Sequence, residues 1–163
     1  MQFGTKLITS GTLERTRMSE FLILKVVAAW LLISLSPAFA SNVDVEMLNK
    51  RDDGAKMVYS LDIVDVEVGD TVTWLPTAKG HNVQFIAGPD SAILPKKSKL
   101  NKEVTQQFDV PGIYLYQCTP HKSMGMIGII VVGKNTNNKE AIASTKVNGK
   151  SKKKLAKLLS ELD

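Results

Sequence analysis

Short apolar runs separated by turn residues are the feature that most limits how this 163-residue chain can fold. Val43, Val45 and Met47 alternate with acidic residues, and this period of two is typical of a strand with one buried face. Comparable runs lie at residues 63–68, 72–74, 83–85, 104–110, 113–117 and 127–132. Turn-forming pairs such as Gly69-Asp70 and Pro111-Gly112 separate them. Short strands with frequent turns predict an all-β domain, either an antiparallel sandwich or a barrel.

The C-terminal segment changes to a helical period. Four leucines, at positions 155, 158, 159 and 162, lie on one face of a predicted helix that Ser151 could cap. Lysines at positions 152–154 oppose the helix dipole, so we expect packing of the leucines on the sheet to hold this helix. We interpret its basic end as a solvated face, with a membrane or partner contact as the alternative.

The first 40 residues have the plan of a Sec-type secretory signal peptide. An apolar run at 26–35 follows Lys25 and precedes Ala38-Phe39-Ala40, a small-x-small cleavage site. The run is about half the roughly 20 residues that a membrane-spanning helix needs. We predict cleavage after Ala40, export to the periplasm and no membrane span afterwards. Met18 is an alternative start, because residues 18–40 would form a complete signal.

Residues 41–163 are expected to form one domain. Removal of residues 1–40 takes away four basic and two acidic residues, so the net charge falls from +5 to +3. Nucleic-acid binding has no support beyond this net charge, which the lysines of the C-terminal segment explain. Cys118 is the only cysteine, so an exported domain without internal disulfides must depend on its core or on something that it binds.

Sulfur and imidazole groups are concentrated near that cysteine. Cys118 ends a predicted strand, His121 follows in a short loop, Met126 precedes the next strand, and His81 lies at the start of another strand. Two imidazoles, a thiolate and a thioether are typical of a type 1 (blue) copper site with a weak axial methionine. Structural zinc usually takes four cysteine or histidine ligands, and iron–sulfur clusters need more cysteines. The pattern therefore indicates one copper ion, cycling between Cu(I) and Cu(II).

The stretches KGHNVQ (79–84) and PGIYLYQCTPHKSMGMIGIIVVG (111–133) resemble the cupredoxins, and among them most closely the pseudoazurins. The resemblance covers essentially all of residues 41–163, including the helical tail. It implies a Greek-key sandwich or barrel of about eight strands. It also implies His81, Cys118, His121 and Met126 as copper ligands. Met124 is the rival for the axial position, but the family spacing of five residues after the second histidine selects Met126.

The same resemblance assigns roles to residues beside the ligands. Asn82 would connect the two ligand loops through Thr119 and offer its backbone N–H to the cysteine sulfur. Pro120 has no N–H, so we expect fewer hydrogen bonds to sulfur and a lower reduction potential. The surface around His121 would serve for partner docking, with these candidates: Lys79, Lys96, Lys97, Lys122 and Met124.

Four protein ligands leave no position for substrate, so we predict a monomeric electron carrier and not an enzyme. The resemblance implies nitrite reductase or nitrous oxide reductase as acceptors and c-type cytochromes as donors, in a denitrifying periplasm. A periplasmic copper storage or delivery module is the alternative function.

Overall fold

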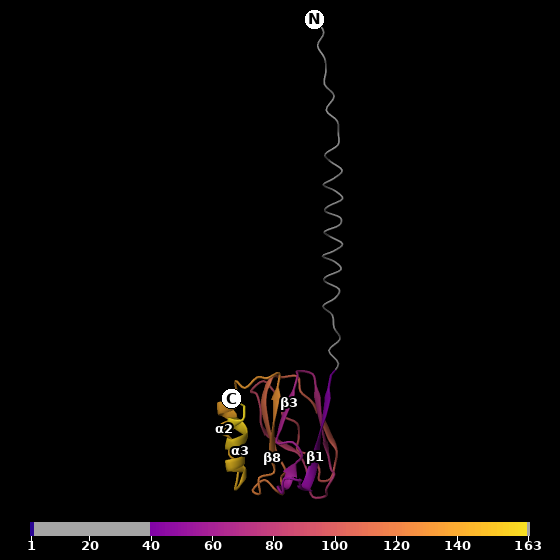
Figure 1. The fold of residues 1–163 in the computed structure, drawn as a ribbon, viewed down its shortest axis with the longest axis vertical. Coiled ribbons are helices and arrows are strands. Elements are labelled where there is room, and N and C mark those ends of the chain that lie inside the picture. The colour runs from indigo at the N-terminus through magenta and orange to yellow at the C-terminus, as the bar shows by residue number, and fades with distance from the viewer. Residues whose placement is uncertain (2–39, 163) are drawn as a thin grey trace. The chain divides into compact units, whose positions relative to one another are not determined.

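Eight strands form two four-stranded sheets in the computed structural model, which describes Met1 and residues 40–162 (Figure 1). The first sheet has the order β2-β1-β4-β6, with these bounds: Lys56–Tyr59, Asn42–Lys50, Thr71–Leu75 and Val104–Gln107. The second has the order β3-β8-β7-β5, with these bounds: Ile63–Val66, Ile127–Val132, Gly112–Gln117 and Gln84–Ala87. The predicted all-β fold of about eight strands with a C-terminal helix is confirmed. The predicted signal peptide and its cleavage site lie largely outside the described residues.

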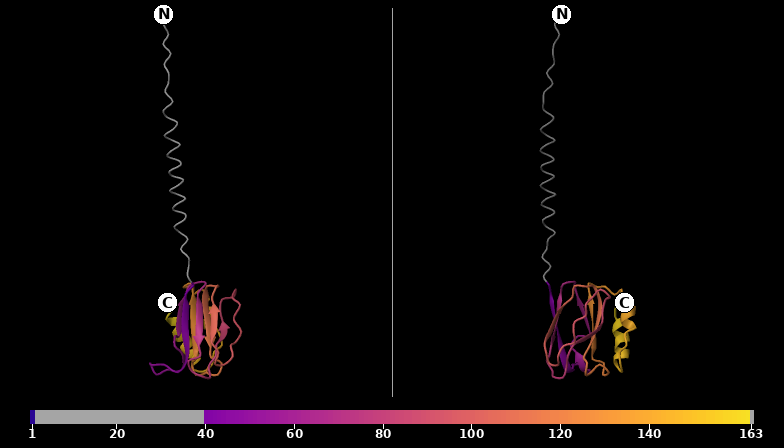
Figure 2. Two further views of the ribbon diagram at one scale, coloured as in Figure 1. Left: turned by 90° about the vertical axis from the view of Figure 1, so that its right-hand side faces the viewer. Right: turned by 180° about the vertical axis from the view of Figure 1, so that it is seen from behind.

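The predicted antiparallel sandwich is correct in its two layers but not in all of its strand pairings. β1 pairs with β4 in parallel, as β3 does with β8, whereas the other four pairings are antiparallel. Each of β1 and β3 therefore pairs with a strand that comes later in the chain and runs in the same direction. Figure 2 shows the strands and the C-terminal helices from two further sides. Alternation of apolar and polar residues reports only which face is buried, and it is the same in both kinds of ladder. The sequence pattern could not reveal the strand directions.

The main core lies between the two sheets and contains a group of aromatic rings in edge-on or tilted contact. Trp74 contacts Tyr116 and Phe85, with ring centroids 5.2 and 5.6 Å apart, and Tyr59 contacts Tyr116 at 4.8 Å. Cys118 and Met126 belong to the same buried cluster. Two residues of the expected metal site are therefore held by the packed core.

Two helices, α2 (Lys139–Ala143) and α3 (Ser151–Ser160), cover the outer face of the second sheet (Figure 1). Leu155, Leu158 and Leu159 are buried in a second cluster with apolar residues of β7 and β8. This confirms that leucine packing on the sheet holds the predicted helix. The capping role of Ser151 is wrong, because Lys150 occupies the N-cap position and no side chain caps the helix.

Neither helix of residues 40–162 has the length and apolar character needed to cross a membrane.

Candidate metal centre

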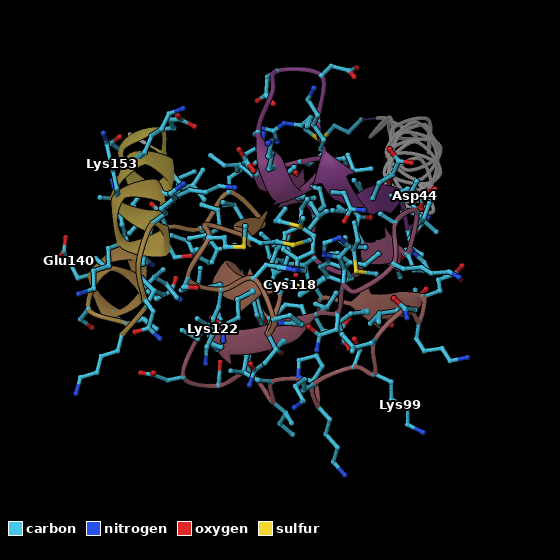
Figure 3. All side chains as sticks on the ribbon, turned by 90° about the horizontal axis from the view of Figure 1, so that it is seen from below. Asp44, Lys99, Cys118, Lys122, Glu140 and Lys153 are labelled. Atoms are coloured by element: carbon cyan, nitrogen blue, oxygen red, sulfur yellow. The ribbon has the colours of Figure 1, made fainter. Side chains whose placement is uncertain are left out.

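Three potential ligand atoms meet at one end of the sandwich. The Sγ of Cys118 lies 3.7 Å from Nδ1 of His81 and 3.5 Å from Nδ1 of His121. The ligand atoms of all three residues lie within 4.8 Å of one another, and the two imidazole centroids are 4.9 Å apart. One cation can therefore contact both nitrogens and the sulfur. Figure 3 looks onto this end of the molecule.

A contact with Asn49 fixes the proton arrangement of His81. The Nε2 atom of the buried ring lies 2.9 Å from Oδ1 of Asn49. An amide oxygen only accepts, so Nε2 carries the hydrogen and Nδ1 keeps its lone pair toward Cys118 and His121. Burial, with a smaller effect of His121, lowers the pKa of His81. The ring is therefore held neutral, which is the form that binds a metal.

Cys118 is fully buried and makes no disulfide. Burial raises the pKa of its thiol, while hydrogen bonds from the backbone N–H groups of Asn82 and His121 act in the opposite direction. The contribution of Asn82 agrees with the expectation from the sequence, whereas the second donor, from His121, was not expected. Without a cation the thiol keeps its proton at neutral pH, so metal binding would have to displace it.

The segment from Cys118 to Met126 is a compact loop closed by its own backbone. The N–H of Cys118 donates to the carbonyl of Met126 at 2.9 Å, and the N–H of His121 donates to the carbonyl of Cys118 at 3.1 Å. Met126 is fully buried and Met124 is 47 % exposed. The loop thus turns one methionine into the core, beside Cys118, and the other into solvent.

Asn82 and Thr119 connect the two loops that carry the ligands. Asn82 donates through Nδ2 to Oγ1 of Thr119 at 3.0 Å, and its Oδ1 accepts from the backbone N–H of Thr119 at 2.8 Å. The Tyr59 hydroxyl donates to the Asn82 carbonyl at 2.8 Å. The Asn82 side chain therefore joins the two ligand loops, and the Asn82 backbone carbonyl connects them to Tyr59 of the aromatic core.

The segment that leads into α3 holds residues 122–123 of the loop from Cys118 to Met126, which we call the ligand loop. The buried hydroxyl of Ser151 donates to the carbonyl of Lys122, and the N–H of Lys150 donates to the carbonyl of Ser123 at 2.9 Å. A Cβ atom on Gly149 would lie only 2.3 Å from that Ser123 carbonyl oxygen, so glycine is required for the approach. The turn between His121 and Met126 is therefore held by the C-terminal helix.

The expected docking residues differ in exposure. His121 and Lys122 are half-buried, whereas Pro120, Met124 and Lys79 are exposed, as are Lys96 and Lys97. Of the three clustered ligand residues, only His121 reaches the surface. Cys118, Lys122 and Lys99 are labelled in Figure 3.

Asn49, Gly149 and Ser151 were not predicted to support the site. Asn49 lies in a strand whose polar residues look merely solvent-facing, and no spacing rule connects it to His81. Gly149 and Ser151 look like an ordinary turn before a helix. A glycine directly before a lysine-rich helix is a signal for Gly149, but its contact with Ser123 joins residues far apart in sequence.

Comparison with known proteins is consistent with this geometry. Residues 45–133 match the family described as copper binding proteins, plastocyanin/azurin family. The chain is 37 % identical to the pseudoazurin of Paracoccus pantotrophus, over 86 % of this chain and 97 % of the relative. It is 38 % identical to the pseudoazurin of Methylorubrum extorquens, over 84 % and 95 %. The native pseudoazurin of Hyphomicrobium denitrificans superposes with a TM-score of 0.69 at 36 % identity, over 74 % and 97 %.

Proposed function

This chain belongs to the pseudoazurins, within the plastocyanin/azurin family of copper-binding proteins, and we propose that it carries single electrons between redox proteins of the periplasm. The observation that carries the proposal is the meeting of two imidazole Nδ1 atoms and one thiol within 4.8 Å, with one of the three residues reaching the surface. Copper is the cofactor of this family, and it supplies a one-electron couple when bound.

We assign His81, Cys118, His121 and Met126 as the copper ligands. The donor set fits the trigonal arrangement of two nitrogens and a thiolate with a weak axial thioether. Met126 is preferred to Met124 because it is buried in the same cluster as Cys118, whereas Met124 faces solvent. Four protein ligands leave no position for a substrate, which favours electron transfer over catalysis.

In this assignment, the residues around the ligands have separate roles. The core and the Asn82–Thr119 bonds keep the ligands in place when the charge of the site changes, which keeps the reorganisation small. The Asn49 contact keeps the His81 proton on Nε2. His121, as the ligand at the surface, provides the route by which electrons enter and leave.

Reconstitution with copper tests this function. We expect an intense visible thiolate-to-copper band that bleaches reversibly on reduction, and its loss in Cys118→Ser. A Met126→Leu variant should shift the spectrum and the potential, whereas Met124→Leu, its exposed control, should leave both unchanged. A colourless cuprous complex would instead indicate copper storage or delivery.

We further propose nitrite reductase or nitrous oxide reductase as electron acceptors and c-type cytochromes as donors. Lys79 and Lys122, next to ligands in sequence, would steer acidic partners toward His121, with Lys96 and Lys97 farther out. Steering acts on the association rate, so neutralising Lys79 and Lys122 should flatten the salt dependence of electron transfer. Neutralising Lys134, beyond the opposite end of β8, is the control.

A further inference from the structure

An open groove of about 1090 Å³ runs between α3 and the loop that joins β1 to β2. Residues 51–58, 124–125 and 149–161 supply most of its lining, together with Asp62. We call it the α3 groove. Its lining includes six lysine or arginine side chains and only three aspartate or glutamate side chains. The groove therefore has a surplus of positive charge, larger than expected for a mildly basic domain.

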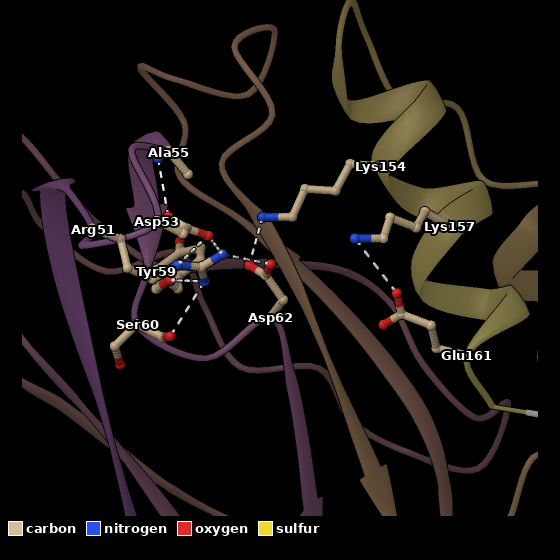
Figure 4. A network of polar contacts seen from close by, with 9 residues as sticks. All are labelled: Arg51, Asp53, Ala55, Tyr59, Ser60, Asp62, Lys154, Lys157 and Glu161. Atoms are coloured by element: carbon tan, nitrogen blue, oxygen red, sulfur yellow. Dashed lines mark hydrogen bonds and ion pairs between the residues drawn. The ribbon is translucent and has the colours of Figure 1, made fainter.

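Part of that charge is neutralised inside the groove (Figure 4). The Asp62 carboxylate accepts from Nη2 of Arg51 at 3.1 Å and from Nζ of Lys154 at 2.6 Å. Lys157 pairs more loosely with Glu161, at 3.6 Å. The Asp62 carboxylate thus connects the β1–β2 loop to α3. The charges of Arg51, Lys154 and Lys157 are already paired within the groove, so they are less available to a partner.

Three further lysines remain for a ligand. Lys56, Lys150 and Lys153 are exposed, and none of them makes an ion pair with another of residues 40–162. They come from both walls, one from β2 and two from the start of α3. An anionic group between the walls could contact lysines from either side.

The groove is continuous with the surface around His121. Met124 lines it and is 47 % exposed, and the Met124 N–H donates to the His121 carbonyl at 2.9 Å. Val58 and Leu158 also line the groove but are buried, so Met124 supplies its exposed apolar surface. A protein that docks over His121 would therefore lie at the mouth of a basic groove with some apolar surface.

We propose that the α3 groove binds an acidic segment of the protein that exchanges electrons with this one, an inference that rests on the proposed function. Such a segment would pair its carboxylates with Lys56, Lys150 and Lys153. Exposed charge pairs of this kind contribute more to orientation and association rate than to affinity. The groove would thus orient the partner around His121, in addition to the lysines beside the ligands.

Titration of the ¹⁵N-labelled cuprous protein with a synthetic oligoglutamate peptide at low ionic strength tests the proposal. We expect chemical-shift changes at Lys56 and along residues 149–157. Lys153→Glu should weaken peptide binding about threefold, as expected from one exposed ion-pair contact. Lys134→Glu makes the same change in net charge at an exposed site away from the groove, and it should have a much smaller effect.

Equal effects of the two substitutions, or shift changes confined to Lys79 and Lys122, would overturn the proposal. Tighter binding of inorganic polyphosphate with the same shift pattern would also overturn it, since the groove would then be a site for phosphate polyanions. The visible copper band is recorded for every variant and tests the proposed function separately from the groove. Absence of the band in the unsubstituted protein would contradict the copper carrier, whatever the result with the peptide.

Discussion

Ser151 and Lys122 are 29 positions apart in the chain, yet the buried hydroxyl of Ser151 donates directly to the backbone carbonyl of Lys122. Lys122 immediately follows His121, so this bond attaches the first turn of α3 to the ligand loop. The parallel bond from the Lys150 N–H to the Ser123 carbonyl adds a second attachment. The C-terminal helix is therefore part of the frame of the metal centre, although it supplies no ligand.

Ser151→Ala should lower the free energy of unfolding by about 1–3 kcal/mol, because the half-buried Lys122 carbonyl loses its hydroxyl donor. Ser160→Ala is the matched control, since Ser160 ends the same helix and its exposed hydroxyl donates to a carbonyl within that helix. Urea denaturation of both variants gives the comparison. Equal losses would show that the bond to the ligand loop contributes nothing special.

Gly149→Ala should cost more than Gly54→Ala. Both glycines have positive φ, +57° and +85°, so both substitutions strain the backbone by about 1–3 kcal/mol. Only at Gly149 would the new Cβ meet a neighbour, the Ser123 carbonyl oxygen at 2.3 Å, whereas nothing lies within 4 Å at Gly54. Thermal unfolding measures the difference. A larger loss at Gly54 would argue against close contact between the helix and the ligand loop.

Asn49→Ala should weaken copper binding by about ten- to a hundredfold, because the His81 ring loses the acceptor that fixes its proton on Nε2. Competition with a chromophoric chelator measures the affinity. Asn137→Ala, at an exposed asparagine between β8 and α2, controls for general effects of losing an amide. Unchanged affinity in Asn49→Ala would mean that the core alone orients His81.

Pro120→Ala should raise the reduction potential. The new N–H could join those of Asn82 and His121 as a donor to the Cys118 sulfur, and this would withdraw electron density from the metal. Voltammetry measures the change, with the exposed Pro111→Ala as control. An unchanged or lower potential would contradict the role proposed for Pro120.

Asp62→Asn should destabilise the domain by about 1–2 kcal/mol near neutral pH and by progressively less in acid. Burial alone would raise the pKa of Asp62, but hydrogen bonds from Arg51 and Lys154 outweigh it and lower the pKa. A carboxylate with a lowered pKa stabilises the fold above its unfolded pKa, about 3.9, and loses that effect as the pH falls through the folded value.

Urea unfolding of the wild-type protein and Asp62→Asn at several pH values measures this dependence. Asp65→Asn, an exposed carboxylate on β3, the strand that begins directly after Asp62, is the control. A difference between Asp62→Asn and wild type that stays constant down to pH 3 would contradict an ionised Asp62 in the folded state.

The sequence predicted those parts of the molecule that depend on local pattern. Period-two runs predicted most strands and the leucine spacing predicted α3, because burial of one face leaves a direct trace in the residue order. β2 was missed, since Val58 and Tyr59 are adjacent and both buried, so the alternation that marks a strand is absent. The parallel pairings were also missed, for they depend on which strands meet and not on their composition.

At the metal centre, the resemblance identified Asn82 and Thr119 as well as the four proposed ligands. The contacts of Asn49 and Ser151 could not be predicted, because neither residue belongs to a motif and each bond joins distant segments. The contacts that hold the ligand side chains in place depend on tertiary packing, which a single sequence does not show.

The attachment of α3 to the ligand loop also bears on the order in which the protein is completed. A chain made from its N-terminus presents Asn49 and His81 early, Cys118 to Met126 late, and Gly149 to Ser151 almost last. The two attachments to the ligand loop can therefore form only after nearly the whole chain has been made. A chain that ends before Gly149 would keep all four proposed ligands but lose both of these attachments to the ligand loop.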